Sequence, residues 1–148
     1  MAPSSMITLT TDFGTVDPYV GTMKGVILGI NPHASIVDIA HQVQPQSIRE
    51  GAYVIGASHR YFPQGTIHVV VVDPGVGSSR HALLVVTPSA TFLAPDNGVL
   101  SRVVSGGYSH EPEPIEASQV ALPPAYTAYR LEEPEFWLQP LSATFHGR

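Results

Sequence analysis

The sequence predicts an α/β domain built on a mostly parallel sheet. Short β-prone runs alternate with segments whose apolar residues recur at helical spacing, which is the pattern of strand–helix–strand units. The run before Asp73 is apolar and the run before Asp12 is β-prone, and each ends in the aspartate, as expected of buried strands that deliver a polar residue to a sheet edge. In open α/β sheets this edge is where ligands bind.

Composition narrows the class of protein. The chain has 148 residues, of which 43% are hydrophobic and 13% charged, so one globular domain with a sizeable core is expected. The net charge of -5 and the single lysine, Lys24, argue against a nucleic-acid partner. The absence of cysteine excludes disulfides and thiolate metal ligands. With no signal-peptide pattern and no apolar run of about twenty residues, we expect a cytoplasmic protein without a membrane partner.

The first strand is expected at Met6–Thr10, followed by a helix that begins at Asp17-Pro18. Aspartate caps free N–H groups and proline fits the first helical position, so Asp17 is predicted to cap this helix. Asn31 and the proline after it end it. Three glycines lie four residues apart along this helix and predict a close approach to a sheet or another helix: Gly21, Gly25 and Gly29.

A second strand is expected at Ser35–Ile39. Ser47 and Glu50 have capping-box spacing and open a second helix that runs to about Arg60. A third strand, Thr66–Val72, leads into Asp73.

Two more strands, Ala82–Val86 and Thr91–Ala94, are joined by a turn at Pro88, and Val99–Val104 forms a short helix. Asn97 in Asp-Asn-Gly is interpreted as a turn former. After Gly106 the proline-rich sequence predicts irregular structure, and the chain ends without a helix stop. We therefore interpret residues 1–148 as a single domain that is truncated at its C-terminal end.

The stretch VVDPGVGSSR, residues 71–80, is the strongest candidate for a site. Asp73 is predicted to emerge from the core, and the Arg80 guanidinium lies one loop away, within reach of it. The alternative is an acidic turn residue and an unrelated surface arginine. Ser78 or Ser79 as a nucleophile is a weak hypothesis, because no strand–serine–helix elbow is present. No pair of histidines has the spacing of a metal site.

Four further motifs extend this stretch into a family resemblance. TTDFG followed by DPYVGTMKG, VDIAHQV, APDNGVL and SATFHGR occur in order with it along the chain. Together they resemble the S-adenosyl-L-methionine hydroxide adenosyltransferases, water-using relatives of fluorinase and chlorinase. The resemblance implies hydrolysis of S-adenosyl-L-methionine to adenosine and L-methionine. It also implies a three-layer α/β/α N-terminal domain, a C-terminal β-barrel domain that is absent here, and a homo-trimer.

The resemblance also assigns residues. It places the family's aspartate–arginine–histidine set on Asp73, Arg80 and His146. The ribose-binding carboxylate falls on Asp12, the carboxylate near the methionine amino group on Asp17, and an aromatic of the adenosyl pocket on Phe145, as the matched motifs give them. In the halogenases the residues matching Asp73 and His146 are tyrosines. A carboxylate would repel a halide and suits water, so the resemblance favours the hydrolase.

The chemistry fits these residue types. The carbon next to a sulfonium is already activated because its thioether leaves uncharged, so neither a general acid, a metal nor a cofactor is required. The enzyme has to place one water in line with the carbon–sulfur bond and accept its proton. Asp73 can accept the proton or orient the water, Arg80 can stabilise hydroxide character, and His146 can orient or relay. The sequence does not say which is the formal base.

Each assignment has a plainer alternative. Asp12 is also explained as a turn residue and His146 as a surface histidine. A non-catalytic module that binds a nucleoside or S-adenosylmethionine, or that serves only in assembly, is the competing hypothesis for the whole chain, with a halogenase less favoured. Because relatives hold part of the substrate with the second domain of a neighbouring subunit, we expect the isolated chain to bind and turn over S-adenosylmethionine poorly.

Overall fold

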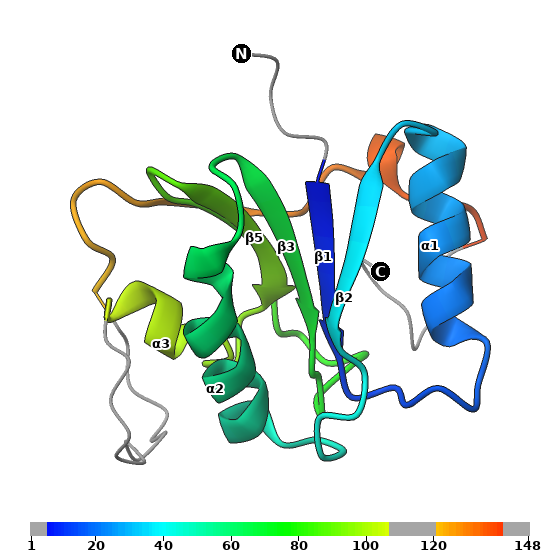
Figure 1. Cartoon of the computed structure of the whole chain (residues 1–148), viewed down its shortest axis with the longest axis horizontal. Coiled ribbons are helices and arrows are strands. Elements are labelled where there is room, and N and C mark those ends of the chain that lie inside the picture. Colours follow the sequence, from blue (N-terminus) through cyan, green and yellow to red (C-terminus); the bar gives the residue numbers. More distant parts are fainter. Residues whose placement is uncertain (1–5, 107–120, 141–148) are drawn as a thin grey trace.

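The computed structural model describes residues 6–106 and 121–140, and they form a six-stranded sheet with helices on its faces (Figure 1). The strand order is β2-β1-β3-β5-β4-β6. The pairs β1–β2, β1–β3 and β3–β5 are parallel, whereas β4 runs antiparallel to both β5 and β6. The prediction of an α/β fold with a mostly parallel sheet is confirmed.

Five of the six strands were predicted from the sequence, each with ends within one residue of those observed. These five are β1 (Met6–Thr11), β2 (Ser35–Ala40), β3 (Thr66–Val71), β4 (Ala82–Val86) and β5 (Ala90–Pro95). The sixth, β6 (Thr127–Arg130), was missed. All four of its residues are exposed, so it lacks the alternation of buried and exposed residues that periodicity detects.

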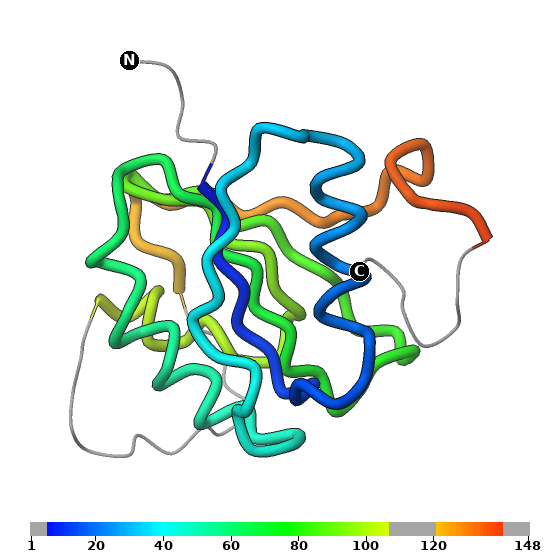
Figure 2. The backbone as a smooth tube through the Cα atoms, turned by 45° about the vertical axis from the view of Figure 1, so that its right-hand side comes forward, coloured from blue at the N-terminus to red at the C-terminus, as the bar shows by residue number. Residues whose placement is uncertain are grey.

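The helices lie on both sides of the sheet. α1 (Tyr19–Ile30) connects β1 to β2, and α2 (Ile48–Ser58) connects β2 back to β3 on the other side of β1. Since parallel crossovers are right-handed, this reversal of direction puts the two helices on opposite faces, as Figures 1 and 2 show. α3 (Ser101–Val104) packs beside α2. Two single-turn 3₁₀ helices, His59–Tyr61 and Pro134–Phe136, complete the description. No helix within 6–106 and 121–140 is long and apolar enough to cross a lipid bilayer.

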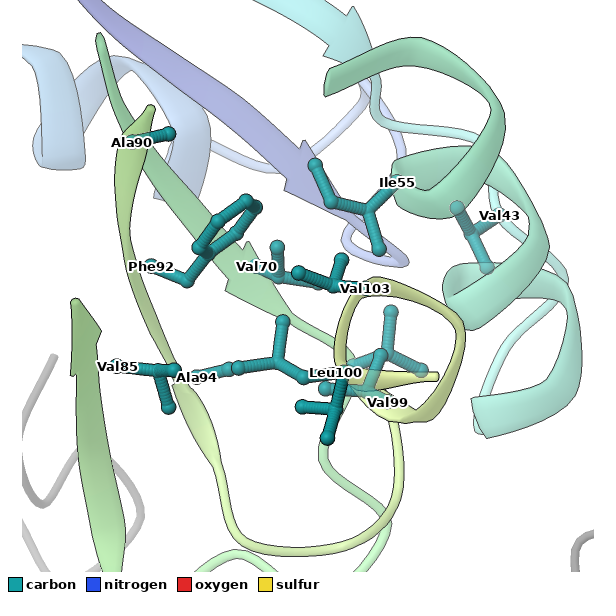
Figure 3. Packing of buried hydrophobic residues seen from close by; sticks show 12 residues of the cluster. Val43, Ile55, Val70, Val85, Ala90, Phe92, Ala94, Val99, Leu100 and Val103 are labelled. Atoms are coloured by element: carbon teal, nitrogen blue, oxygen red, sulfur yellow. The ribbon is translucent and has the colours of Figure 1, made fainter. Parts of the chain in front are cut away.

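The hydrophobic core lies between the sheet and the α2–α3 layer (Figure 3). Phe92 of β5, Val70 of β3 and Ile55 of α2 are fully buried there. Two glycines let α2 approach closely. A Cβ on Gly51 would lie 3.0 Å from Cγ2 of Val72, and one on Gly56 would lie 2.7 Å from Cβ of Arg102.

Two predictions for α1 are wrong. Among the described residues, none lies within 4 Å of the place where a Cβ would stand on Gly21, Gly25 or Gly29, and the close approach is found on α2 instead. The helix begins at Tyr19 with Pro18 as its N-cap, and no side chain caps it. Asp17 is therefore not the cap, because the chain enters helical geometry one residue later than predicted. At the other helix the prediction is confirmed: the side chain of Ser47 accepts the Glu50 N–H.

A buried histidine lies within the sheet. His68 of β3 is completely buried, and its Nδ1 is 2.7 Å from the Thr8 hydroxyl on the neighbouring strand β1. Its ring stacks on Phe92 with centroids 4.9 Å apart, and its Nε2 has no hydrogen-bond partner among the described residues. Burial, followed by the nearby His59, lowers the pKa of His68 from 6.5 to about 4. The ring is thus neutral at physiological pH.

We expect Gly56→Ala to lower the free energy of unfolding by about 1–3 kcal/mol, since the new methyl group would overlap Cβ of Arg102. Gly25→Ala is the matched control on an exposed helix face and should raise stability by up to about 1 kcal/mol. Urea unfolding of both variants checks this. Equal effects would contradict the packing of α2 described above.

Acid should destabilise the domain through His68. Because its pKa is about 4 in the folded chain and 6.5 otherwise, the unfolded state binds the proton more tightly. Stability is full above pH 6.5 and falls as the pH drops toward 4, by up to about 3 kcal/mol. Urea unfolding between pH 7 and 4.5 measures this loss. His68→Phe should flatten the profile, and His33→Gln, at an exposed histidine, should not; an unchanged slope in His68→Phe would rule out this source.

Candidate active site

The candidate site lies at the carboxyl edge of the parallel strands, the lower edge of the sheet in Figure 1. β1 is the point where the strand order reverses, because the chain moves from it to β2 on one side and then to β3 on the other. Ligands of open α/β sheets bind at such switch points. In the register of β1 and β3, Thr11 pairs with Val71, so Asp12 and Asp73 follow the ends of adjacent strands.

Asp73 and Arg80 form an ion pair at this edge. Nη2 of Arg80 donates to Oδ1 of Asp73, and the side chains are only 11% and 18% exposed for Asp73 and Arg80 respectively. The Arg80 Nη1 also contacts the Ser78 hydroxyl at 3.3 Å. Gly75 makes room for the guanidinium, since a Cβ there would overlap Nη1 of Arg80. A partly desolvated pair of opposite charges is stronger than a surface pair, so the loop presents a fixed carboxylate and a fixed cation together.

Both ends of the loop that carries this pair are tied to the end of β5. The Asn97 side chain donates from Nδ2 to the Val72 carbonyl at 2.8 Å. The Asp96 N–H donates to the His81 carbonyl at 2.9 Å. Asn97 also accepts the Val99 N–H with Oδ1, as predicted for a turn former. These bonds bracket Asp73 and Arg80, and the contact to Val72 is the part that sequence reasoning missed.

Asp12 lies in a turn that is held from the β2 side. Its Oδ2 accepts the backbone N–H of Gln46 at 2.7 Å. The next residues of the turn are also fixed: Phe13 N–H donates to the Thr11 hydroxyl at 3.2 Å, and Gly14 N–H donates to the His41 carbonyl at 2.7 Å. The carboxylate is therefore oriented before any ligand arrives.

A polar chain behind Asp12 braces the same turn. His41 is buried, its Nδ1 lies 2.9 Å from the Thr11 hydroxyl, and its Nε2 lies 2.9 Å from Oδ1 of Asp38. Lys24 contacts the other oxygen of Asp38 at 2.6 Å. Burial would raise the pKa of Asp38, but the hydrogen bonds from Lys24 and His41 outweigh it and lower the pKa below 3.8. The Thr11 hydroxyl donates to Nδ1 or accepts from it, depending on the tautomer of His41.

A pocket of about 360 Å³ lies beside the Asp38 and His41 side chains, at the end of β2. Five residues contribute its polar lining: Thr15, Asp38, His41, Gln42 and Glu50. Neither Asp73 nor Arg80 lines it. Its carboxylates are already engaged, Asp38 as above and Glu50 by the Gln44 N–H at 3.1 Å.

The structure thus brings three of the six predicted site residues to one edge: Asp12, Asp73 and Arg80. Asp17 is exposed in the connection from β1 to α1. Phe145 and His146 lie outside the described residues, so their placement stays a prediction. Within 6–106 and 121–140 no group of three or more metal-ligating side chains is found.

Comparison with known proteins agrees with these observations. The sequence model of the SAM hydroxide adenosyltransferase N-terminal domain matches residues 7–148. The chain is 35% identical over 148 residues to a protein named (R)-S-adenosyl-L-methionine hydrolase from Salinispora arenicola, and 48% identical over 103 residues to one of that name from Methanocaldococcus jannaschii. A crystal structure of an uncharacterized conserved protein from Thermotoga maritima superposes with a TM-score of 0.81 at 37% identity, covering 97% of this chain.

The chain spans about half the length of the relatives it matches. The alignments cover all of this chain but 51% of the Salinispora protein, and 66% of this chain but 39% of the Methanocaldococcus protein. The Thermotoga structure is covered over 49% of its chain.

We expect Gly75→Ala to separate Asp73 from Arg80 while leaving the fold intact. The new methyl overlaps the end of a flexible side chain, so the guanidinium moves away, and loss of the partly desolvated ion pair costs about 1–3 kcal/mol. Faster exchange of the Arg80 guanidinium protons by NMR is the expected sign. Ser79→Ala, an exposed neighbour in the same loop, should leave that exchange unchanged. Slow exchange in Gly75→Ala would contradict the close contact.

Proposed function

Because this chain belongs to the SAM hydroxide adenosyltransferase family, we propose that it carries the reactive half of an S-adenosyl-L-methionine hydrolase. The observation that supports this most directly is the mostly buried Asp73–Arg80 pair, which lies at the same edge of the sheet as Asp12, at the switch point. A carboxylate and a cation held together beside a ligand edge suit the activation of a water molecule.

In the proposed reaction, a water oxygen attacks the 5′ carbon of the substrate. The new carbon–oxygen bond forms as the carbon–sulfur bond breaks, and the bonding electrons neutralise the sulfonium. The water loses one proton to the site. The products are adenosine and L-methionine, with the thioether leaving uncharged, so the reaction calls for no cofactor or metal. The protein contributes mainly alignment of the water with the breaking bond.

Asp73 and Arg80 have complementary roles in this step. The Asp73 carboxylate accepts a hydrogen bond or the proton of the water, and the Arg80 guanidinium stabilises the hydroxide character that develops on the oxygen. Their ion pair keeps both groups in place without substrate, which lowers the reorganisation needed during the reaction. His146, from the family resemblance, completes the set.

The other assigned residues bind the substrate. Asp12 offers a carboxylate that accepts from two adjacent ribose hydroxyls. Asp17 is proposed to face the methionine amino group, and Phe145 to line the adenosyl pocket. The site would be completed by a second domain and by neighbouring subunits of a homo-trimer in the cytoplasm.

Incubation with S-adenosyl-L-methionine in H₂¹⁸O tests this function. The chain is assayed alone and after joining to the carboxyl-terminal half of the Salinispora arenicola relative. Adenosine with ¹⁸O in its 5′ hydroxyl, and L-methionine without it, are expected by mass spectrometry. Added chloride or fluoride should give no 5′-halo product. Absence of adenosine from both proteins would overturn the hydrolase, and retained nucleoside binding would then favour the non-catalytic module.

Asp73→Asn should lower the rate of adenosine formation by about 10²-fold or more, since general-base assistance contributes on that order. Adenosine binding should change little, because Asp73 is assigned to the water and not to the nucleoside. Glu135→Gln, an exposed carboxylate far along the chain, is the matched control and should keep the full rate. Equal rates in Asp73→Asn and the control would remove Asp73 from the mechanism.

A further inference from the structure

Gln46 has an unusual backbone conformation. Its φ of 65° makes it the one non-glycine residue with positive φ in the described part of the chain. The left-handed region costs a residue with a Cβ about 1 kcal/mol or more. Such strain persists only where the surrounding structure enforces it, and it is concentrated at functional sites.

The conformation determines where the Gln46 amide points. Its N–H donates to Oδ2 of Asp12 at 2.7 Å, across 34 residues of sequence. A hydrogen bond to an ionised carboxylate is roughly twice as strong as one between neutral groups. Positive φ allows the Gln46 N–H to face Asp12 while the chain beyond its Cα turns into α2, so the strain and the contact to Asp12 belong together.

The turn is held by bonds on both sides of Gln46. Ser47 N–H donates to the Gln44 carbonyl at 2.9 Å, and Ile48 N–H donates to the Gln46 carbonyl at 3.1 Å. Gln44 N–H donates to the Glu50 carboxylate at 3.1 Å. Glu50 thus reaches past the N-cap, Ser47, and fastens the turn to the first turn of α2. The helix start enforces the left-handed residue.

We infer that Gln46 is a positioning residue for Asp12. Its amide fixes one carboxylate oxygen, Oδ2, and thereby sets the plane in which the other, Oδ1, lies. The described residues supply no hydrogen bond to Oδ1. A fixed carboxylate plane suits bidentate acceptance from a vicinal diol, the ribose of the substrate. The inference rests on the proposed function for the identity of that diol, and it concerns the backbone of Gln46 and not its side chain.

Three substitutions separate backbone from side chain. Gln46→Gly and Gln46→Asn remove the side chain or shorten it but tolerate positive φ. Gln46→Val resists positive φ because it is β-branched. Each variant is titrated by NMR with adenosine and with 2′,3′-dideoxyadenosine, and the ratio of the two dissociation constants reports recognition of the diol.

We expect the ratio to persist in Gln46→Gly and Gln46→Asn and to fall about tenfold in Gln46→Val, the loss of one charge-assisted hydrogen bond. Asp12→Asn should remove the diol preference and shift the residue 46 amide resonance. A ratio preserved in Gln46→Val, or lost equally in Gln46→Gly, would overturn the inference. Thermal unfolding of each variant is the control, since a purely structural role changes stability but not the ratio.

The outcomes distinguish this inference from the proposed function. If the ratios follow the expected series but no adenosine forms from S-adenosylmethionine, the positioning role stands and the hydrolase fails. If adenosine forms but the ratios do not depend on residue 46, the hydrolase stands and the positioning role fails. Lack of any diol preference in the unaltered chain contradicts the positioning role.

Discussion

The parallel register between β1 and β3 is the constraint on which the site depends. Thr11 and Val71 are paired neighbours, so the two aspartates that follow these strands leave the sheet side by side. A one-residue slip would separate the buried Thr8 hydroxyl from Nδ1 of the buried His68, which it contacts at 2.7 Å across these two strands. The interior of the sheet therefore sets the geometry at the edge, although none of these buried residues takes part in the chemistry.

Much of this arrangement could be predicted from the sequence, for definite reasons. Strands β1 to β5 are short β-prone runs with clear turn residues around them, and their alternation with helices predicted a mostly parallel sheet. The reversal of strand order at β1 was not predicted, because alternation alone does not determine on which side of a strand the next one pairs. The rule that carboxyl ends of parallel strands share an edge was enough to group Asp12 with Asp73. The pairing of Asp73 with Arg80 was predicted from one short loop and is confirmed.

The features that were missed depend on contacts between distant residues. The Asn97 amide reaches the Val72 carbonyl across 25 residues, and the Gln46 amide reaches Asp12 across 34. No local pattern marks either contact, and glutamine does not signal positive φ as glycine or asparagine would. The prediction of a close contact at the α1 glycines failed because their regular spacing is a local pattern. Whether another element packs against that face depends on the fold, and no described residue does so.

The loop from residue 72 to residue 81 joins two strands that are not neighbours. β5 lies between β3 and β4, so the loop has to span only about 10 Å, two strand spacings. The loop is longer than this span requires, so it folds back on itself and brings the Arg80 guanidinium to the Asp73 carboxylate. The hydrogen bonds that hold the loop are at its two ends, at Val72 and His81, and the residues between them do not belong to the core. Substitutions inside this loop can therefore change the chemistry of the site, whereas the stability of the fold depends on residues elsewhere in the chain.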